Sequence, residues 1–189
     1  MTRIAIVFAT SGGNTLETAR MAAVGCTDAG AEVALYNAAA FSPSVLLEHD
    51  GILIGEPTWG DGAHHADFAR FDAAMAEVLA PGRLLAGKGA AAFVGCDRAY
   101  RNFGRALELI EGRLIECGAQ VLQQGLKIEL KHNPTSREYT KRWGRDFVAR
   151  LRGELERQDH TARMGRADVD RVMGISKTER ENRDLQGLY

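Results

Sequence analysis

The sequence has 189 residues, of which 45% are hydrophobic and 26% charged, and its formal net charge is −1. This length and composition predict one soluble domain with an appendage, and the near-neutral charge argues against a nucleic-acid-binding protein. No apolar run approaches the roughly 20 residues of a membrane-spanning helix, and no export signal opens the chain, so we expect a cytoplasmic protein. Three widely spaced cysteines without a C-x-x-C pair favour reduced thiols and no metal site.

Short apolar runs alternate with longer amphipathic segments. The runs predict five strands, at 3–9, 31–37, 51–55, 89–95 and 119–130. The clearest helices are predicted at 14–29, 101–117 and about 136–155. This alternation predicts a parallel sheet with helices on both faces and right-handed crossovers. Ligands bind such sheets beyond the carboxyl ends of the strands, so the loops after the first, third and fourth strands are the candidate site.

The loop after the first strand reads TSGGNT, residues 10–15. Its hydroxyls, amide and glycines stand immediately before a predicted helix N-terminus, where backbone N–H groups favour an anion. The loop has no lysine or arginine and fits neither the P-loop nor the dinucleotide-binding pattern. It predicts a phosphate cradle, with a plain polar turn near Asn14 or Thr15 as the alternative.

The other two loops each carry an aromatic residue. GEPTWGDGAHH, residues 55–65, contains Trp59, and VGCDRAYRNF, residues 94–103, contains Tyr100. A large ring on a polar loop buries little apolar area unless something else covers it. Two such loops beside a phosphate cradle predict a flat ligand clamped between rings.

In this order, the three loops resemble those of the short-chain flavodoxins over roughly residues 1–156. The resemblance implies an α/β flavodoxin-like three-layer sandwich, with a five-stranded parallel sheet in the order 2-1-3-4-5 and FMN as cofactor. It implies that loop 10–15 holds the phosphate, although Gly12 stands where the family usually has Ser or Thr, and that Trp59 and Tyr100 cover the two faces of the isoalloxazine. The implied cofactor-binding residues are Thr10, Ser11, Gly12, Gly13, Asn14, Thr15, Pro57, Thr58, Trp59, Gly60, Asp61, Gly62, Gly95, Cys96, Asp97, Tyr100 and Phe103.

The resemblance also implies how the chain would tune the flavin. Gly60 matches the residue whose carbonyl turns toward N5 and stabilises the one-electron-reduced state, and glycine permits that turn cheaply. The nearby acids, Glu56, Asp61, Asp67 and Asp97, would disfavour the anionic, fully reduced state. Cys96 stands where a glycine is common in the family.

Two arginines depart from this pattern. Arg98 and Arg101 flank Tyr100, and a cation near the ring would stabilise the anionic reduced flavin. The sequence therefore predicts a less reducing couple and a docking face of mixed charge. The alternative is that both arginines are solvated.

His64 and His65 adjoin the candidate site but lack a third ligand at metal-binding spacing, and Ser11 lacks the G-x-S-x-G setting of a nucleophile. We therefore expect no catalytic residue in this set.

The segment 157–189 lies outside the resemblance. Residues 166–174 and 176–186 predict two short helices. They contain too few apolar residues for a core of their own, so the segment either stays mobile or docks on the main domain, a second subunit or a redox partner.

The leading functional hypothesis is an electron carrier that shuttles single electrons between a flavin-containing or iron–sulfur reductase and an acceptor redox enzyme. It predicts a monomer, or a dimer made through the tail, with no nucleic-acid or membrane partner. The alternatives are an FMN-dependent NAD(P)H:quinone oxidoreductase and an accessory module that keeps the fold without flavin.

Overall fold

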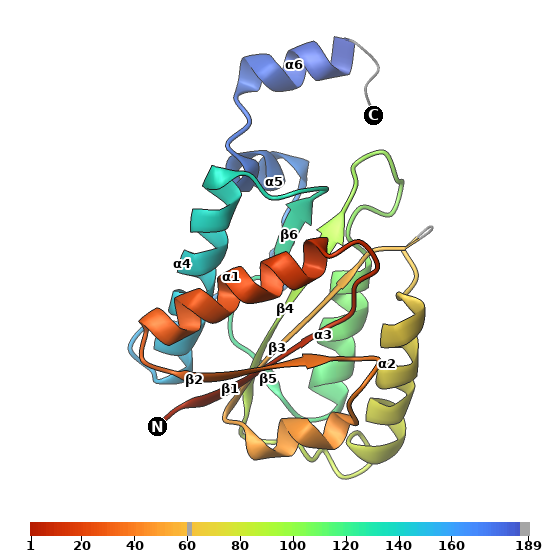
Figure 1. Cartoon of the computed structure of the whole chain (residues 1–189), viewed down its shortest axis with the longest axis vertical. Helices are drawn as coiled ribbons and strands as arrows, with labels where there is room; N and C mark the ends of the chain where they lie inside the picture. Colours follow the sequence, from red (N-terminus) through yellow and green to blue (C-terminus); the bar gives the residue numbers. More distant parts are fainter. Residues whose placement is uncertain (60–61, 186–189) are drawn as a thin grey trace.

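A computed structural model describes residues 1–59 and 62–185, and its centre is a parallel β-sheet (Figure 1). The strands are β1 (Arg3–Phe8), β2 (Glu32–Asn37), β3 (Gly51–Pro57), β4 (Gly89–Cys96), β5 (Gln120–Val121) and β6 (Leu126–Glu129). They lie in the order β2-β1-β3-β4-β5, and β6 also pairs with β4. The predicted order 2-1-3-4-5 is confirmed, and the carboxyl ends of β1, β3 and β4 lie side by side.

The predicted fifth strand is interrupted. β5 pairs with Gly89 and Ala90 of β4, whereas β6 pairs with Phe93 through Cys96. Between them Gln123 and Gln124 turn toward the last long helix, where Gln123 Nε2 donates to Trp143 O at 3.1 Å and Gln124 O accepts from Trp143 Nε1 at 3.0 Å. The prediction of one continuous strand over 119–130 is wrong, because these residues bond a helix instead of β4.

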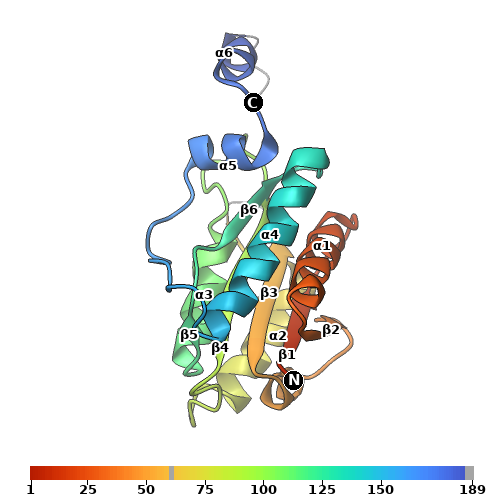
Figure 2. The ribbon, with the colours of Figure 1, turned by 90° about the vertical axis from the view of Figure 1, so that its left-hand side faces the viewer.

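Helices cover both faces of the sheet (Figure 2). One face carries α1 (Asn14–Asp28) and α4 (Pro134–Leu151), and the other carries the 3-10 helix η1 (Pro43–Glu48), α2 (Ala66–Val78) and α3 (Ala106–Glu116). Successive strand residues alternate between the two cores: Ile4 and Ile6 face α1 and α4, whereas Ala5 and Val7 face the other layer. Across the two described stretches, no helix combines the length and apolar character needed to cross a membrane.

Two helix boundaries differ from the predictions. α3 begins at Ala106 and not at 101, because residues 101–105 form turns and Gly104 adopts a left-handed φ of 69°. α4 begins at Pro134 behind an Asn133 capping box and ends at Leu151, with Gly153 in a left-handed conformation just beyond. The later start of α3 leaves a longer loop after β4, and this loop carries Tyr100.

The helices α1 and α4 approach each other closely at two glycines. A Cβ on Gly25 would lie 1.8 Å from the carbonyl oxygen of Lys141, and one on Gly144 would lie 2.4 Å from that of Ala22. Backbone therefore packs against backbone at this crossing, and only glycine fits at these positions.

The C-terminal segment contributes to the core. It forms α5 (Arg166–Met173) and α6 (Lys177–Leu185). Four of its side chains are buried in the core that α1 and α4 cover: Met164, Val169, Val172 and Met173. Before α5 the chain runs beside the interrupted strand, where Gln158 N–H donates to Leu122 O at 3.0 Å and Gln124 Nε2 donates to Ala162 O. α6 projects away from the body of the molecule in both views (Figures 1 and 2).

Candidate functional site

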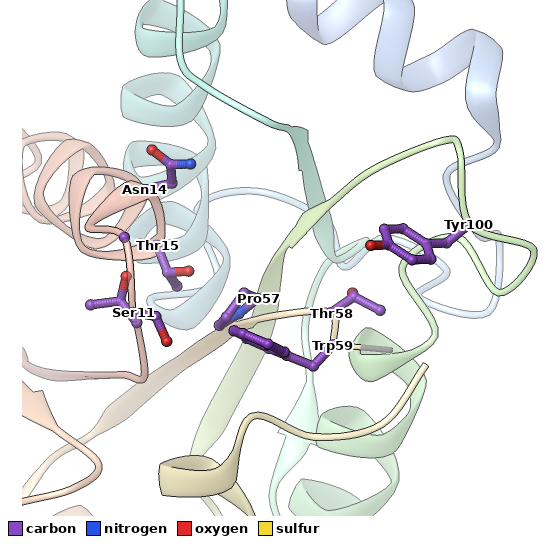
Figure 3. A pocket seen from close by; sticks show the side chains of 9 residues that line it. Ser11, Asn14, Thr15, Pro57, Thr58, Trp59 and Tyr100 are labelled. Carbon is purple, nitrogen blue, oxygen red and sulfur yellow. The ribbon is translucent and has the colours of Figure 1, made fainter. Parts of the chain in front are cut away.

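The three predicted loops meet at the carboxyl ends of β1, β3 and β4 around a hollow of about 250 Å³ (Figure 3). It is lined by Thr10, Ser11, Gly12, Asn14, Thr15, Pro57, Thr58, Trp59 and Tyr100. A second hollow of about 160 Å³ adjoins it and shares four of these residues. Gly95, Cys96, Asp97 and Leu130 complete its lining. Together the hollows have the size range of small-ligand sites.

The loop after β1 presents the N-terminus of α1 to the larger hollow. Gly13 occupies the N-cap position in a left-handed conformation, φ 86°, and no side chain caps the helix. Asn14 and Thr15 are the first helical residues, so both lie at the helix start, as the alternative of a plain polar turn also expected. A Cβ added at Gly12 or Gly13 would meet no atom within 4 Å. Uncapped N–H groups, open space and neighbouring hydroxyls suit a phosphate group.

The two aromatic residues stand on separate loops beside this cradle. Trp59 is 51% exposed and Tyr100 is 50% exposed, which is unusual for rings of this size. In Figure 3, Trp59 lies between the hydroxyl-bearing side chains of the β1 loop and Tyr100. The Trp59 loop is fixed at both sides: Trp59 exchanges two backbone hydrogen bonds with Ala63, at 3.2 and 2.9 Å, and Thr58 N–H donates to Gly95 O at 2.8 Å.

One buried polar atom tests whether a ligand fits here. Among the described residues that line the hollows, Thr58 has a buried Oγ1 without a hydrogen-bond partner. An unpartnered buried hydroxyl costs free energy, and a polar ligand in the hollow would remove that cost. The orphaned hydroxyl, the uncapped helix and the two half-exposed rings together fit a ligand with both a phosphate and a flat aromatic system.

Comparison with known proteins shows which family this chain belongs to. The model of the family described as flavodoxin matches residues 6–144. The chain belongs to the flavodoxin family. It is 30% identical over 149 residues to probable flavodoxin 2 of Bacillus subtilis, an alignment that covers 78% of this chain and 95% of that one. It is 34% identical over 133 residues to the flavodoxin of Nitratidesulfovibrio vulgaris, covering 68% and 86%.

A solved flavodoxin structure has a similar fold. Oxidised flavodoxin 1 of Bacillus cereus superimposes with a TM-score of 0.72 at 34% identity, covering 78% of this chain and 97% of that chain. The chain is therefore an electron-transfer protein of the short-chain flavodoxin type, and its cofactor is FMN.

Three further residues predicted to contact FMN are Asp97, Cys96 and Phe103. Asp97 borders the second hollow, and its Oδ1 accepts from Ala99 N–H at 2.9 Å. Cys96 lines the second hollow and is buried, with its Sγ donating to Ile128 O. Phe103 packs against the core beneath Lys127, whose Nζ lies 5.3 Å from the ring centroid, and its contact with FMN stays a prediction.

Part of the predicted site lies outside the described residues. Gly60, with the carbonyl expected to face N5, and the carboxylate of Asp61 both fall there. Gly62 follows with a φ of 93°, and a Cβ at this position would come within 2.9 Å of Arg105 side-chain atoms. Glycine is therefore required at position 62 of the Trp59 loop.

The surroundings of the Arg98 side chain differ from those predicted. It is only 5% exposed, its Nε and Nη2 donate to the two carboxylate oxygens of Glu129, and Nη2 also donates to Asp170 at 2.6 Å. The alternative that Arg98 is solvated is wrong, because the side chain is buried against two carboxylates, and its effect on the reduced flavin stays a prediction. Two carboxylates balance its charge, and only Arg101 of the pair is exposed.

A chain of hydrogen bonds that the sequence did not reveal runs beneath the Trp59 loop. Glu56 is fully buried at the end of β3, its Oε1 lies 2.5 Å from His64 Nδ1, and its Oε2 accepts from His65 N–H at 2.7 Å. The hydrogen bond that His64 donates to Glu56 raises the pKa of His64. Burial raises the pKa of Glu56, whose carboxyl group is paired with His64 beneath the Trp59 loop. The only sequence signal was the closeness of Glu56 to two histidines.

The other side chains with metal-binding or redox potential are occupied or protected. Over residues 1–59 and 62–185, no cluster of three histidine, cysteine or acidic side chains could hold a metal ion. Cys26, Cys96 and Cys117 are free and buried, and burial raises the pKa of the Cys117 thiol to about 11. A thiol with such a raised pKa is a poor nucleophile at neutral pH.

Proposed function

We propose that the protein holds the FMN phosphate in loop 10–15 and the isoalloxazine between Trp59 and Tyr100, and that it shuttles single electrons between a reductase and an acceptor enzyme. The observation that carries this proposal is the pair of half-exposed rings from two different strand ends, which line one hollow together with an uncapped helix N-terminus.

Loop 10–15 binds and orients. The N-terminus of α1 carries the positive end of the helix dipole, and Ser11 with Thr15 adds hydroxyl donors beside it. No lysine or arginine lies in the loop, so N–H groups and hydroxyls supply the binding free energy for the phosphate. This arrangement distinguishes FMN from riboflavin, which has no phosphate.

Trp59 and Tyr100 exclude water from the two faces of the ring. When bound, FMN supplies a redox couple that exchanges electrons one at a time. Rings that cover both faces leave no room for a second substrate stacked on the flavin, so electrons must pass through the solvent-facing edge of the site. A protein partner docked at that edge suits this geometry, which favours a carrier over a quinone reductase.

Binding measurements test the site. Base-on-aromatic stacking is worth about 1–3 kcal/mol, so Trp59→Ala and Tyr100→Ala are each expected to raise the Kd for FMN by about 5- to 150-fold, as read from quenching of flavin fluorescence. Phe41→Ala is the matched control, because Phe41 is also a half-exposed ring, 47% exposed, but does not line either hollow. Equal losses of affinity in all three variants would overturn the assignment.

Turnover measurements test the role. With NADPH, a flavin-containing reductase and cytochrome c as acceptor, the rate is expected to rise in proportion to the added FMN-loaded protein. The loaded protein alone is expected to give almost no oxidation of NADPH by a quinone. Rapid quinone reduction without a reductase would replace the carrier with an enzyme.

A further inference from the structure

The helix α5 contacts the loop that carries Tyr100. Asp170 of α5 is fully buried, and its Oδ1 accepts from Arg98 Nη2 at 2.6 Å. Arg166, one turn earlier on the same helix, donates from Nη2 to the backbone carbonyl of Arg98 at 3.1 Å. Arg98 lies two residues before Tyr100, so α5 holds both the side chain and the backbone at the base of the Tyr100 loop.

Arg98 lies at the centre of a buried network drawn from three parts of the chain. Glu129 of β6 receives two hydrogen bonds from the guanidinium, and Asp170 receives one. The second carboxylate oxygen of Asp170 lies 2.6 Å from Arg180 Nε of α6. Two arginines thus face two carboxylates. Removing one member leaves a buried charge uncompensated, which is far more costly than losing a surface ion pair.

The segment that supplies Asp170 and Arg166 lies beyond the matched family region, which ends at residue 144. This segment nevertheless packs against the rest of the domain. Val169, Val172 and Met173 are buried in the core, and Asn133 Nδ2 donates to Met173 O at 2.7 Å. In Figure 1, α5 lies beyond the carboxyl end of β6, at the same end of the sheet as the loops of the site.

We propose that α5 is a support for the FMN site, in which Asp170 and Arg166 are positioning residues that hold the Tyr100 loop through Arg98. The proposal rests on the proposed stacking of Tyr100 on FMN. It assigns to the C-terminal extension a defined part in cofactor binding: it fixes the ring that covers one face of the isoalloxazine and thereby raises the affinity for FMN.

Asp170→Asn in the full-length chain tests the proposal. Without the carboxylate, Arg98 loses its charged partner on α5, and we expect the Kd for FMN to rise about tenfold, as for coupled neighbouring groups. Asp168→Asn is the matched control: it removes the same charge from the same helix, where Asp168 accepts from Gly165 N–H and pairs with Arg171 at 3.4 Å. It is expected to change the Kd by less than about twofold.

A double-mutant cycle tests whether Asp170 acts through Tyr100. In a Tyr100→Ala background the ring is already lost, so adding Asp170→Asn is expected to weaken FMN binding by less than about twofold. If Asp170→Asn has its full effect in that background, or if Asp168→Asn weakens binding equally, α5 acts only through general stability and the proposal is overturned.

Hydrogen exchange of the protein without FMN provides a readout independent of the cofactor. Amides 97–101 are expected to exchange about tenfold faster in Asp170→Asn than in the wild type, whereas those of α1 are expected to be unchanged. Unchanged exchange at 97–101 would overturn the proposed support. A wild type that failed to bind FMN would instead contradict the proposed function, so the two failures are distinguishable.

Discussion

Ser11 Oγ lies 2.7 Å from Nε2 of His65, and this contact joins the phosphate loop after β1 to the end of the Trp59 loop. The other ring nitrogen, Nδ1, accepts a hydrogen bond from the backbone N–H of Asp67 at 3.2 Å. A backbone N–H can only donate, so the ring proton is on Nε2 and points at Ser11. The Ser11 oxygen is therefore an acceptor toward His65, and its own hydrogen is free to donate into the cradle.

His65→Gln and Ser11→Ala are accordingly expected to weaken FMN binding by about fivefold each, the equivalent of one hydrogen bond of ~1 kcal/mol. The double variant is expected to lose little more than the larger single loss, because Ser11→Ala removes the hydroxyl donor and His65→Gln removes the group that orients the same donor. Riboflavin is the control ligand: it lacks the phosphate, so its Kd is expected to stay within about twofold of the wild-type value in Ser11→Ala. An equal loss for both ligands would contradict a phosphate-directed role.

The Glu56–His64 pair makes stability depend on pH. The hydrogen bond that His64 donates to Glu56 raises the pKa of His64, and burial raises the pKa of Glu56. A group whose pKa is raised by folding stabilises the folded state fully below its unfolded value, about 6.5 for histidine, and that stabilisation is lost as the pH rises through the folded value. Each unit of the raised pKa is worth ~1.4 kcal/mol.

We therefore expect the free energy of unfolding, measured with urea on the protein without FMN, to fall as the pH rises above about 6.5. The slope is expected to be much smaller in Glu56→Gln, which cannot carry the charge that raises the pKa of His64. His160→Gln changes a histidine remote from the pair and is expected to keep the wild-type slope. The same slope in Glu56→Gln would assign the pH dependence to other groups.

Arg101 is the exposed cation that remains beside Tyr100 once Arg98 is neutralised by its partners. Arg101→Gln is expected to make the couple of the fully reduced flavin more negative, by less than about 60 mV because solvent screens an exposed charge. Potentiometric titration at low and high salt measures the shift, which should shrink with added salt. Lys177→Gln removes a cation that is 85% exposed on α6 and is expected to leave both potentials unchanged.

The crossing of α1 and α4 is expected to tolerate no side chain. Gly25→Ala would place a methyl group 1.8 Å from a backbone carbonyl, so the helices must separate, at a cost of about 3 kcal/mol or more. Gly112→Ala, also inside a helix but with no atom within 4 Å of the added Cβ, is expected to stabilise by ~0.5–1 kcal/mol. Urea unfolding of both variants measures the contrast. A mild effect of Gly25→Ala would contradict so close a crossing.

The alternation of strands and helices and the positions of the three loops followed from the sequence because apolar periodicity and strand-end chemistry are local signals, whereas the strand order was implied by the resemblance to short-chain flavodoxins. The ion network around Arg98 did not, because its partners lie 31 and 72 residues further along the chain and no local pattern indicates which acid an arginine meets. The interrupted fifth strand escaped prediction for a similar reason. Gln123 and Gln124 are compatible with an edge strand, and only the approach of Trp143 turns them away from β4.

The path of residues 157–164 bears on how the protein behaves in concentrated solution. β5 and β6 form the outer edge of the sheet, and an open edge offers unpaired N–H and C=O groups to any other extended chain. The backbone N–H of Gln158 donates to the carbonyl of Leu122, and the carbonyl of Ala162 accepts from the side chain of Gln124. The linker to α5 thus shields this border from intermolecular strand addition. A chain shortened to end before residue 157 would lose that shield and be prone to aggregate.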